Sequence, residues 1–322
     1  MIVILAEQPG PPQVLSAVER PDPEPGPGQV VVDVAVAAIT FVDTQMRAGT
    51  FPGLPASAFP VVLGNGVGGT VAALGDGVDP AWRGAEVVTA TGGRGGYATR
   101  ALAAADDLHR VPPGLAVADG VALLADGRTA LALIQAAEVA AGQTVVVTAA
   151  GGGVGGLLVQ LARRAGADVV ALAGDERKRD HARALGATAT VDYRAEGWPD
   201  RIDAAAPGGL DVAFDGVGGD VGPALVARIR PGGRYLPHGA ASGRFAAMDG
   251  AAVAERRITV IPLADVGGGP AGMYRLVEQA FALAAAGELR PTVGQTYALA
   301  DAASAHAAIE ARATLGKTLL LV

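Results

Sequence analysis

The sequence predicts an α/β protein that combines a barrel-like β domain with a doubly wound parallel-sheet domain. Residues 1–120 read as short strands separated by glycine and proline, a pattern typical of a β-barrel. From Thr144 onward, apolar β-branched runs alternate with helical segments, which predicts a parallel sheet wound by right-handed crossovers. At 322 residues the chain is also longer than one hydrophobic core usually serves, which favours two domains.

In the first part, the predicted strands are apolar runs set between clusters of glycine and proline. They are Ile2–Leu5, Val30–Ile39, Thr70–Leu74 and Gly84–Ala90. Around Pro112–Asp119 the composition changes to alanine-rich helical segments, at residues 121–124 and 129–137. We therefore place the domain boundary near residue 123.

In the second part, strands and helices alternate with short connections. The predicted strands are residues 145–149, 169–173, 189–191, 210–214, 234–238 and 258–263. The predicted helices are residues 155–165, 176–185, 221–229, 274–286 and 300–311, followed by a closing strand at residues 317–322. Gly166 and Gly186 follow the first two helices, where glycine is favoured because it adopts the left-handed conformation without strain.

Composition excludes several classes of function. The formal charge of −7 disfavours nucleic acid or an anionic membrane surface as a partner. The chain has no cysteine, and therefore no disulfide, thiolate nucleophile or thiolate metal site. The uncharged run 139–162 is interrupted by a glycine turn, and Met1–Leu5 is too short for a signal peptide. We expect a cytoplasmic protein that binds neither nucleic acid nor membrane.

The segment Gln143–Gly156 places a β-branched strand directly before a glycine cluster and a helix. Glycines let the chain reverse and let a ligand touch bare backbone, while the helix N-terminus attracts an anion. A dinucleotide pyrophosphate is the ligand typical of this arrangement, and a glycine-rich turn without ligand is the alternative. The motif has two possible registers, Gly151, Gly153 and Gly156, or Ala150, Gly152 and Gly155.

The end of the second strand of such a domain discriminates the ribose 2′ position. NAD enzymes place an acid there, but this chain has Ala173 and Gly174. The basic run Arg177–Arg179 can pair with a 2′-phosphate, so NADPH is favoured over NADH; the alternative is a solvated helix face. Asp175 counts against this interpretation, because a carboxylate repels a phosphate; the alternative is that Asp175 is simply the N-cap of the next helix.

Several stretches, in their order and spacing, carry a resemblance to a known family. They are Phe41–Thr44 with Arg47 and Gly49, Gly95–Ala98, Thr129–Ala130, Ala149–Gly155, Ala184–Ala187, Asp192–Tyr193, Asp211–Gly219, Pro231–Gly233, Gly239–Gly243, Ala305–His306 and Gly316–Lys317. In these the chain resembles the medium-chain dehydrogenase/reductase superfamily, in its zinc-independent, zeta-crystallin-like quinone oxidoreductase branch. The resemblance implies a GroES-like domain of residues 1–123 and 290–322, and a Rossmann domain of residues 124–289.

The resemblance also implies a cofactor site for NADPH and a homodimer that pairs through Thr259–Leu263. It sets the second register of the glycine motif. Lys178 would contact the 2′-phosphate, Tyr193 would lie against the adenosine, and Thr129 and Gly239 would lie near the nicotinamide. The implied cofactor-binding residues are Thr129, Ala150, Gly152, Gly153, Val154, Gly155, Gly174, Lys178, Tyr193 and Gly239.

For catalysis, no metal is predicted, because the chain lacks cysteine and its four histidines show no ligand spacing. Without zinc, a quinone or activated C=C bond is the favoured acceptor, since conjugation delocalises the arriving charge. Hydrogen-bond donors then polarise the carbonyl oxygen. The candidate catalytic residues are Thr40, Gln45 and His238, of which His238 can also protonate an enolate or serve a purely structural role.

The leading hypothesis is therefore an NADPH-dependent reductase of quinones or α,β-unsaturated carbonyl compounds. Departures from the family pattern affect the substrate side: Thr40 stands where asparagine is common, and Gly66 where an acid is usual. Two alternatives stay open. One is a biosynthetic tailoring enzyme, reductive or redox-neutral, that acts on a bulky substrate, and the other is an NADPH-binding module without turnover.

Overall fold

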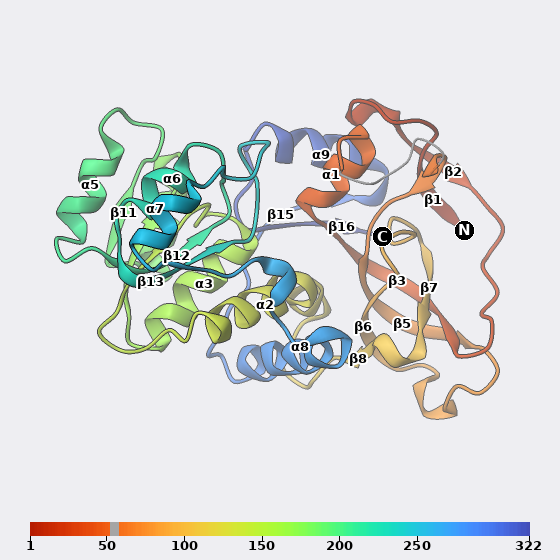
Figure 1. The fold of residues 1–322 in the computed structure, drawn as a ribbon. Coiled ribbons are helices and arrows are strands. Elements are labelled where there is room, and N and C mark those ends of the chain that lie inside the picture. The colour runs from red at the N-terminus through yellow and green to blue at the C-terminus, as the bar shows by residue number, and fades with distance from the viewer. Residues whose placement is uncertain (52–57) are drawn as a thin grey trace. The chain divides into compact units, whose positions relative to one another are not determined.

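The computed structural model describes residues 1–51 and 58–322, which form two compact units (Figure 1). Unit 1 consists of Met1–Ala125 and Val277–Val322, and unit 2 of Asp126–Leu276. Helices α2 (Val117–Ala136) and α8 (Gly269–Ala285) contain the points where the chain passes from one unit to the other. The expected domain limits at 123–124 and 289–290 stay a prediction, since packing units need not end where domains do.

Unit 1 is built on a seven-stranded sheet in the order β15-β16-β3-β5-β6-β8, with β7 also paired to β3. Its strands are β3 (Gln29–Ile39), β5 (Gly66–Leu74), β6 (Glu86–Ala90), β7 (Arg100–Ala104), β8 (Leu108–Arg110), β15 (Val293–Ala298) and β16 (Lys317–Leu321). The long strand β3 pairs with β5 on one side, and on the other side with β7 and then β16. The two ends of the chain thus share one sheet, as the orange β3 and blue β16 show in Figure 1.

A second, three-stranded sheet in unit 1 has the order β2-β1-β4. It comprises β1 (Ile2–Ala6), β2 (Leu15–Glu19) and β4 (Val61–Val62). Residues of β1 and β3 enter a core with Leu63, Tyr97 and Leu320, all buried.

Short 3₁₀ turns occur in both units. They lie at Pro12–Val14, Pro80–Trp82, Ala105–Asp107 and Leu299–Asp301 in unit 1, and at Leu263–Asp265 in unit 2.

Unit 2 contains a six-stranded parallel sheet in the order β11-β10-β9-β12-β13-β14. The strands are β9 (Thr144–Val147), β10 (Asp168–Leu172), β11 (Ala189–Val191), β12 (Leu210–Asp215), β13 (Ile229–Pro237) and β14 (Thr259–Val260). The chain runs outward from β9 to β11, then returns beside β9 and runs outward again from β12 to β14. This reversal confirms the predicted doubly wound sheet, and ligands bind such sheets beyond the carboxyl ends of the strands where the order reverses.

The helices of unit 2 connect successive strands and cover them. They are α3 (Gly153–Arg164), α4 (Glu176–Ala184), α5 (Trp198–Ala205), α6 (Val221–Val226) and α7 (Gly250–Glu255). Helix α3 packs on β9 and β10, and α4 on β10 and β11. The central strands are buried on both faces, as the fully buried run Val145–Val147 of β9 shows. A continuous apolar run is what a doubly covered strand requires.

Several elements differ from the sequence prediction. The N-terminal part is not all-β, because helix α1 (Phe41–Ala48) follows β3. The two helical segments expected at 121–124 and 129–137 are one helix, α2. The elements not predicted are β2, β4, β7, β8, β15, α1, α5 and α7, most of them short. Helix α9 (Ala302–Glu310) lies within the predicted range 300–311. Among the described residues, no helix has the length and apolar character needed to cross a membrane.

Candidate functional site

The predicted phosphate cradle is the turn between β9 and α3. Ala149 adopts φ 49°, and the amide of Ala150 donates to the carbonyl of Leu172, 3.1 Å away. Gly152 is the N-cap of α3 and offers no side chain to the helix, so the first-turn N–H groups are left for an anion. A Cβ at Gly155 would lie 2.3 Å from the carbonyl oxygen of Ala149, so only glycine fits there.

The turn thus brings together five of the predicted cofactor residues: Ala150, Gly152, Gly153, Val154 and Gly155. Asp126 of α2, which the sequence did not single out, also lies there: a Cβ at Gly153 would be 1.9 Å from Asp126 Oδ2. Thr129 stands one turn further along α2 and therefore on the same side of that helix as Asp126. Helix α2 thus presents a carboxylate and, on the same side, a hydroxyl, with the carboxylate at the start of α3.

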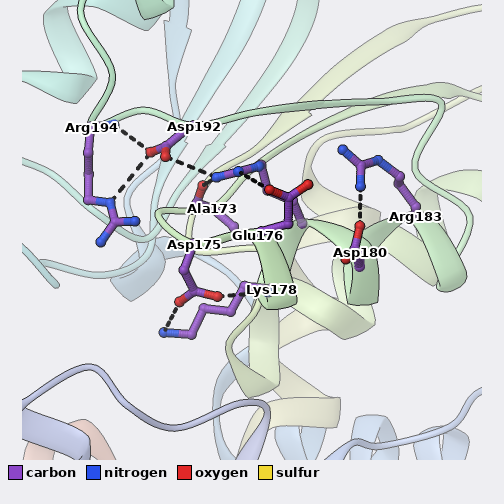
Figure 2. A network of polar contacts seen from close by, with 9 residues as sticks. Ala173, Asp175, Glu176, Lys178, Asp180, Arg183, Asp192 and Arg194 are labelled. Carbon is purple, nitrogen blue, oxygen red and sulfur yellow. Dashed lines mark hydrogen bonds and ion pairs between the residues drawn. The ribbon is translucent and has the colours of Figure 1, made fainter.

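The side chain of Lys178 packs against the same turn and lies beside Asp175, as Figure 2 shows. A Cβ at Gly151 would be 2.6 Å from Lys178 Cγ, so this glycine makes room for the lysine stem. Asp175 is the N-cap of α4: its Oδ1 accepts from the Lys178 amide at 2.9 Å, and its Oδ2 lies 3.3 Å from Lys178 Nζ. Partial burial acts to raise the pKa of Asp175, but these contacts with Lys178 lower it overall. The N-cap reading of Asp175 is therefore confirmed.

Beyond the end of β10 a second cation covers the predicted ribose site. A Cβ at Gly174 would be 2.7 Å from Arg194 Nε. Asp192 pairs with Arg194 through Oδ1 and Nε at 3.4 Å, and with Arg179 through Oδ2 and Nη1 at 3.0 Å, as Figure 2 shows for Asp192 and Arg194. Burial acts to raise the pKa of Asp192, but the Arg194 amide and the two arginine charges lower it.

Tyr193, the predicted adenosine contact, stands between these two residues. It is half-buried and packs against the core that the sheet of unit 2 forms with its helices. Arg194 was missed by the sequence reasoning, although its position two residues after Asp192, just beyond a predicted strand, was the available signal.

On the other side of the reversal, β13 leads into His238 and Gly239. The amide of His238 donates to the carbonyl of Asp215 at 2.8 Å, and a Cβ at Gly216 would be 2.8 Å from His238 Cε1. A Cβ at Gly239 would in turn be 2.8 Å from the Gly216 carbonyl oxygen, so this approach also requires glycine. The two strand ends therefore pack backbone against backbone.

Burial lowers the pKa of His238 to about 4, although the Asp215 carboxylate acts to raise it. The residue as a whole is half-buried, but its Nε2 is enclosed and has no hydrogen-bond partner among the described residues. At neutral pH the imidazole is neutral. Burial thus disfavours the charged form of His238 more than the Asp215 carboxylate favours it. The catalytic role of His238 stays a prediction.

A buried polar network fixes the loop next to His238. Asp215 Oδ1 accepts from the Thr148 hydroxyl at 2.8 Å and from the amides of Val217 and Gly218 at 2.9 and 3.0 Å. Its Oδ2 accepts from the Tyr235 hydroxyl at 2.6 Å. Burial raises the pKa of Tyr235, and the carboxylate adds to this. Sequence reasoning did not single out this network, since it joins Asp215 of β12 and Tyr235 of β13 to Thr148, which directly follows β9.

The remaining predicted catalytic residues lie in unit 1. Thr40 is the N-cap of α1, and its hydroxyl is 2.7 Å from Asp43 Oδ2. Asp43 is buried, which raises its pKa, and its Oδ1 accepts from the amide of Gly64 at 3.2 Å. The Thr40 hydroxyl is thus already engaged in a capping box. Gln45 is half-buried in the middle of α1.

Tyr97 and His306 form a buried polar pair in the core of the same unit. Tyr97 and His306 are fully buried, and the phenol oxygen is 3.0 Å from His306 Nε2. Burial, together with the nearby Arg47 charge, lowers the pKa of His306 to about 3. Over residues 1–51 and 58–322, no group of three or more His, Asp or Glu side chains is placed to hold a metal ion.

Comparisons with known proteins agree with this geometry. The alcohol dehydrogenase GroES-like domain model matches residues 26–113, and the zinc-binding dehydrogenase model matches residues 153–280. The quinone oxidoreductase of Pseudomonas aeruginosa is 31% identical over 97% of this chain and 97% of its own length. The chain belongs to the quinone oxidoreductase family.

The chain is also similar to a solved structure with bound NADPH and to a reductase of another substrate. The quinone oxidoreductase of Escherichia coli, solved in complex with NADPH, covers the whole of both chains with a TM-score of 0.92 at 27% identity. The 2-haloacrylate reductase of a Burkholderia species is 31% identical over 92% of each chain. The resemblance to the zinc-independent branch of the medium-chain dehydrogenase/reductase superfamily is confirmed, as is the fold of a GroES-like domain with a Rossmann domain.

Proposed function

We propose that this protein transfers a hydride from NADPH to a quinone or to the conjugated C=C bond of an α,β-unsaturated carbonyl compound. The protein is an NADPH-dependent oxidoreductase. One observation carries the cofactor side of the proposal: a bare glycine turn follows β9, and the Lys178 side chain lies beyond the carboxyl end of the adjacent strand β10. This spacing suits the pyrophosphate and the 2′-phosphate of one dinucleotide.

The residues of the cradle bind and orient the cofactor. The first-turn N–H groups of α3 would hold the pyrophosphate, and Lys178 and Gly174 would lie at the 2′-phosphate. Gly216 and Gly239 carry no side chains of their own at the strand ends, which leaves backbone for a flat ring to lie against. When bound, NADPH supplies the hydride from C4 of its nicotinamide.

The acceptor side relies on neutral hydrogen-bond donors. His238 is uncharged at neutral pH and would donate from a ring N–H, so it would polarise a carbonyl oxygen without supplying an imidazolium proton. The Gln45 amide and the Thr40 hydroxyl are the candidates from unit 1, although Thr40 would have to loosen its contact with Asp43. Conjugated acceptors need only this modest polarisation. The name of the Burkholderia relative, a 2-haloacrylate reductase, supports an activated C=C bond as one acceptor class.

We also propose a homodimer that pairs at the edge of the parallel sheet. Strand β14 is the last strand on that side, and Thr259 and Val260 are both exposed. Ile261 donates its amide to Tyr235 of β13, so the amide of Val260 faces away from the sheet. An open edge of this kind can pair with a second copy of the same chain.

The activity is tested by mixing the protein with NADPH and a panel of quinones and enones while following the absorbance of the reduced nicotinamide. We expect consumption of at least one acceptor class. A Gly155→Ala variant should lose cofactor binding and turnover, because its Cβ would meet the Ala149 carbonyl at 2.3 Å. Gly250→Ala is the matched control, since a Cβ there meets nothing within 4 Å. Tight NADPH binding with no acceptor consumed would instead establish a non-catalytic NADPH-binding module.

A further inference from the structure

The guanidinium of Arg194 covers the point where a dinucleotide ribose is expected. Gly174 follows β10, and a Cβ built on it would lie 2.7 Å from Nε and 3.0 Å from Cζ of Arg194. Because position 174 is glycine, Arg194 can occupy this place without moving its guanidinium aside. The end of this strand is the place where Rossmann domains distinguish a 2′-hydroxyl from a 2′-phosphate.

Asp192 contacts Arg194 through the backbone amide and the Nε atom of the arginine. Its Oδ1 accepts from the Arg194 amide at 2.9 Å and from Nε at 3.4 Å. The two terminal nitrogens of Arg194 have no hydrogen-bond partner within the described part of the chain, and 56% of the side chain is exposed. Asp192 therefore contacts only Nε of the guanidinium, and the N–H groups of Nη1 and Nη2 are left to donate to a ligand. Two such donors side by side form a fork that suits a phosphate.

The neighbouring arginine is engaged differently. Arg179 pairs with the other oxygen of Asp192 at 3.0 Å, with Glu176 at 3.6 Å, and contacts the carbonyl of Ala173 at 3.5 Å. Its side chain is only 16% exposed. Arg179 thus helps to hold the Asp192 carboxylate in place, while the guanidinium of Arg194 lies next to Gly174.

We propose that Arg194 binds the 2′-phosphate of NADPH together with Lys178 and makes the site prefer NADPH to NADH. The proposal rests on NADPH as the cofactor and goes beyond the predicted set, in which Lys178 was the sole charged contact. The two cations reach the ribose from different elements: Lys178 from α4, and Arg194 from the segment after β11. Each carries a carboxylate partner, Asp175 or Asp192, that fixes its position while the ligand is absent.

The test is calorimetric binding of two fragments, adenosine 2′,5′-bisphosphate and adenosine 5′-monophosphate, which differ in the 2′-phosphate. Arg194→Ala should weaken binding of the bisphosphate by about tenfold to a hundredfold and leave the monophosphate unchanged, as expected for charge-assisted hydrogen bonds. Arg194→Lys should recover only part of the loss, because it keeps the charge but not the fork. In steady-state kinetics, KM for NADPH should rise in Arg194→Ala while KM for NADH stays the same.

Arg183→Ala is the matched control, because this substitution removes the same charge. Arg183 pairs with Asp180 on α4, and its side chain is 49% exposed. The Arg183→Ala variant should bind both fragments like the unmodified protein. Equal weakening of both fragments by Arg194→Ala would overturn the proposal and indicate stacking on the adenine. Unchanged binding of both fragments would also overturn it, while leaving NADPH as the cofactor. If the unmodified protein showed no preference for the bisphosphate, the NADPH assignment itself would fail.

Discussion

At the residue scale, Asp215 shows how one side chain can organise a site. It is fully buried and accepts four hydrogen bonds, one of them from the Tyr235 hydroxyl. A buried carboxylate is costly unless it is fully hydrogen-bonded, and here hydroxyls and amides supply every partner that the structure shows. The loop that begins at Gly216 is held in place by these contacts, and His238 packs against it. The shape of the site near Gly239 thus depends on a residue that need not touch the cofactor.

Tyr235→Phe should lower the free energy of unfolding by about 1.5–3 kcal/mol, the usual value of a hydrogen bond to a charged group. The phenyl ring keeps the packing, so the loss reports the contact with Asp215. Urea unfolding followed by circular dichroism measures the change. Tyr297→Phe is the control, because the Tyr297 side chain is half-buried and its hydroxyl makes no hydrogen bond within the described residues. Equal effects of the two substitutions would contradict this account of Asp215.

At the scale of elements, long periodic segments were predictable and short ones were not. The strands β9, β10 and β12 and the helices α3 and α4 were predicted within a few residues, because each is a strong pattern bounded by glycine or a cap. Helix α1 was missed, although Thr40, Asp43 and the left-handed Gly49 are sequence signals of a capped helix. The family resemblance drew attention to these residues as a motif rather than as the start and end of a helix.

Thr40→Ala should destabilise the protein by about 1 kcal/mol, since it removes the hydroxyl that accepts from the Asp43 amide. Thr40→Ser keeps this cap and is the matched control. Thermal unfolding compares the two variants with the unmodified protein. A loss of stability in Thr40→Ser as large as that in Thr40→Ala would show that the methyl group, and not the capping box, supports α1.

At the scale of the whole molecule, the chain devotes one unit to each half of the proposed function. The cofactor residues gather on unit 2, and Thr40 and Gln45 lie in unit 1. Sequence evidence is stronger for the cofactor half, because a dinucleotide imposes the same turn and strand-end chemistry on every Rossmann domain. Acceptors differ among relatives, so residues on the substrate side carry no comparable constraint.

The proposed homodimer makes a prediction at this scale. Val260→Pro removes an amide that faces away from the sheet, so the monomer should fold as before while pairing at β14 weakens. Light scattering coupled to size exclusion should show a dimer for the unmodified protein and for Val260→Ala, and a monomer for Val260→Pro. A dimer that persists in Val260→Pro would place the interface elsewhere.

The sequence by itself determined the α/β class, the glycine turn and the bias toward NADPH, since each depends on residues close together along the chain. Tertiary structure alone decided which distant residues complete the site. Arg194 reaches Gly174 because the parallel strands β10 and β11 end at the same edge of the sheet. Tyr235 reaches Asp215 because β12 and β13 are neighbours, and Asp126 reaches Gly153 because α2 contacts the start of α3. It also decided the charge of His238, because a pKa depends on burial that no local pattern encodes.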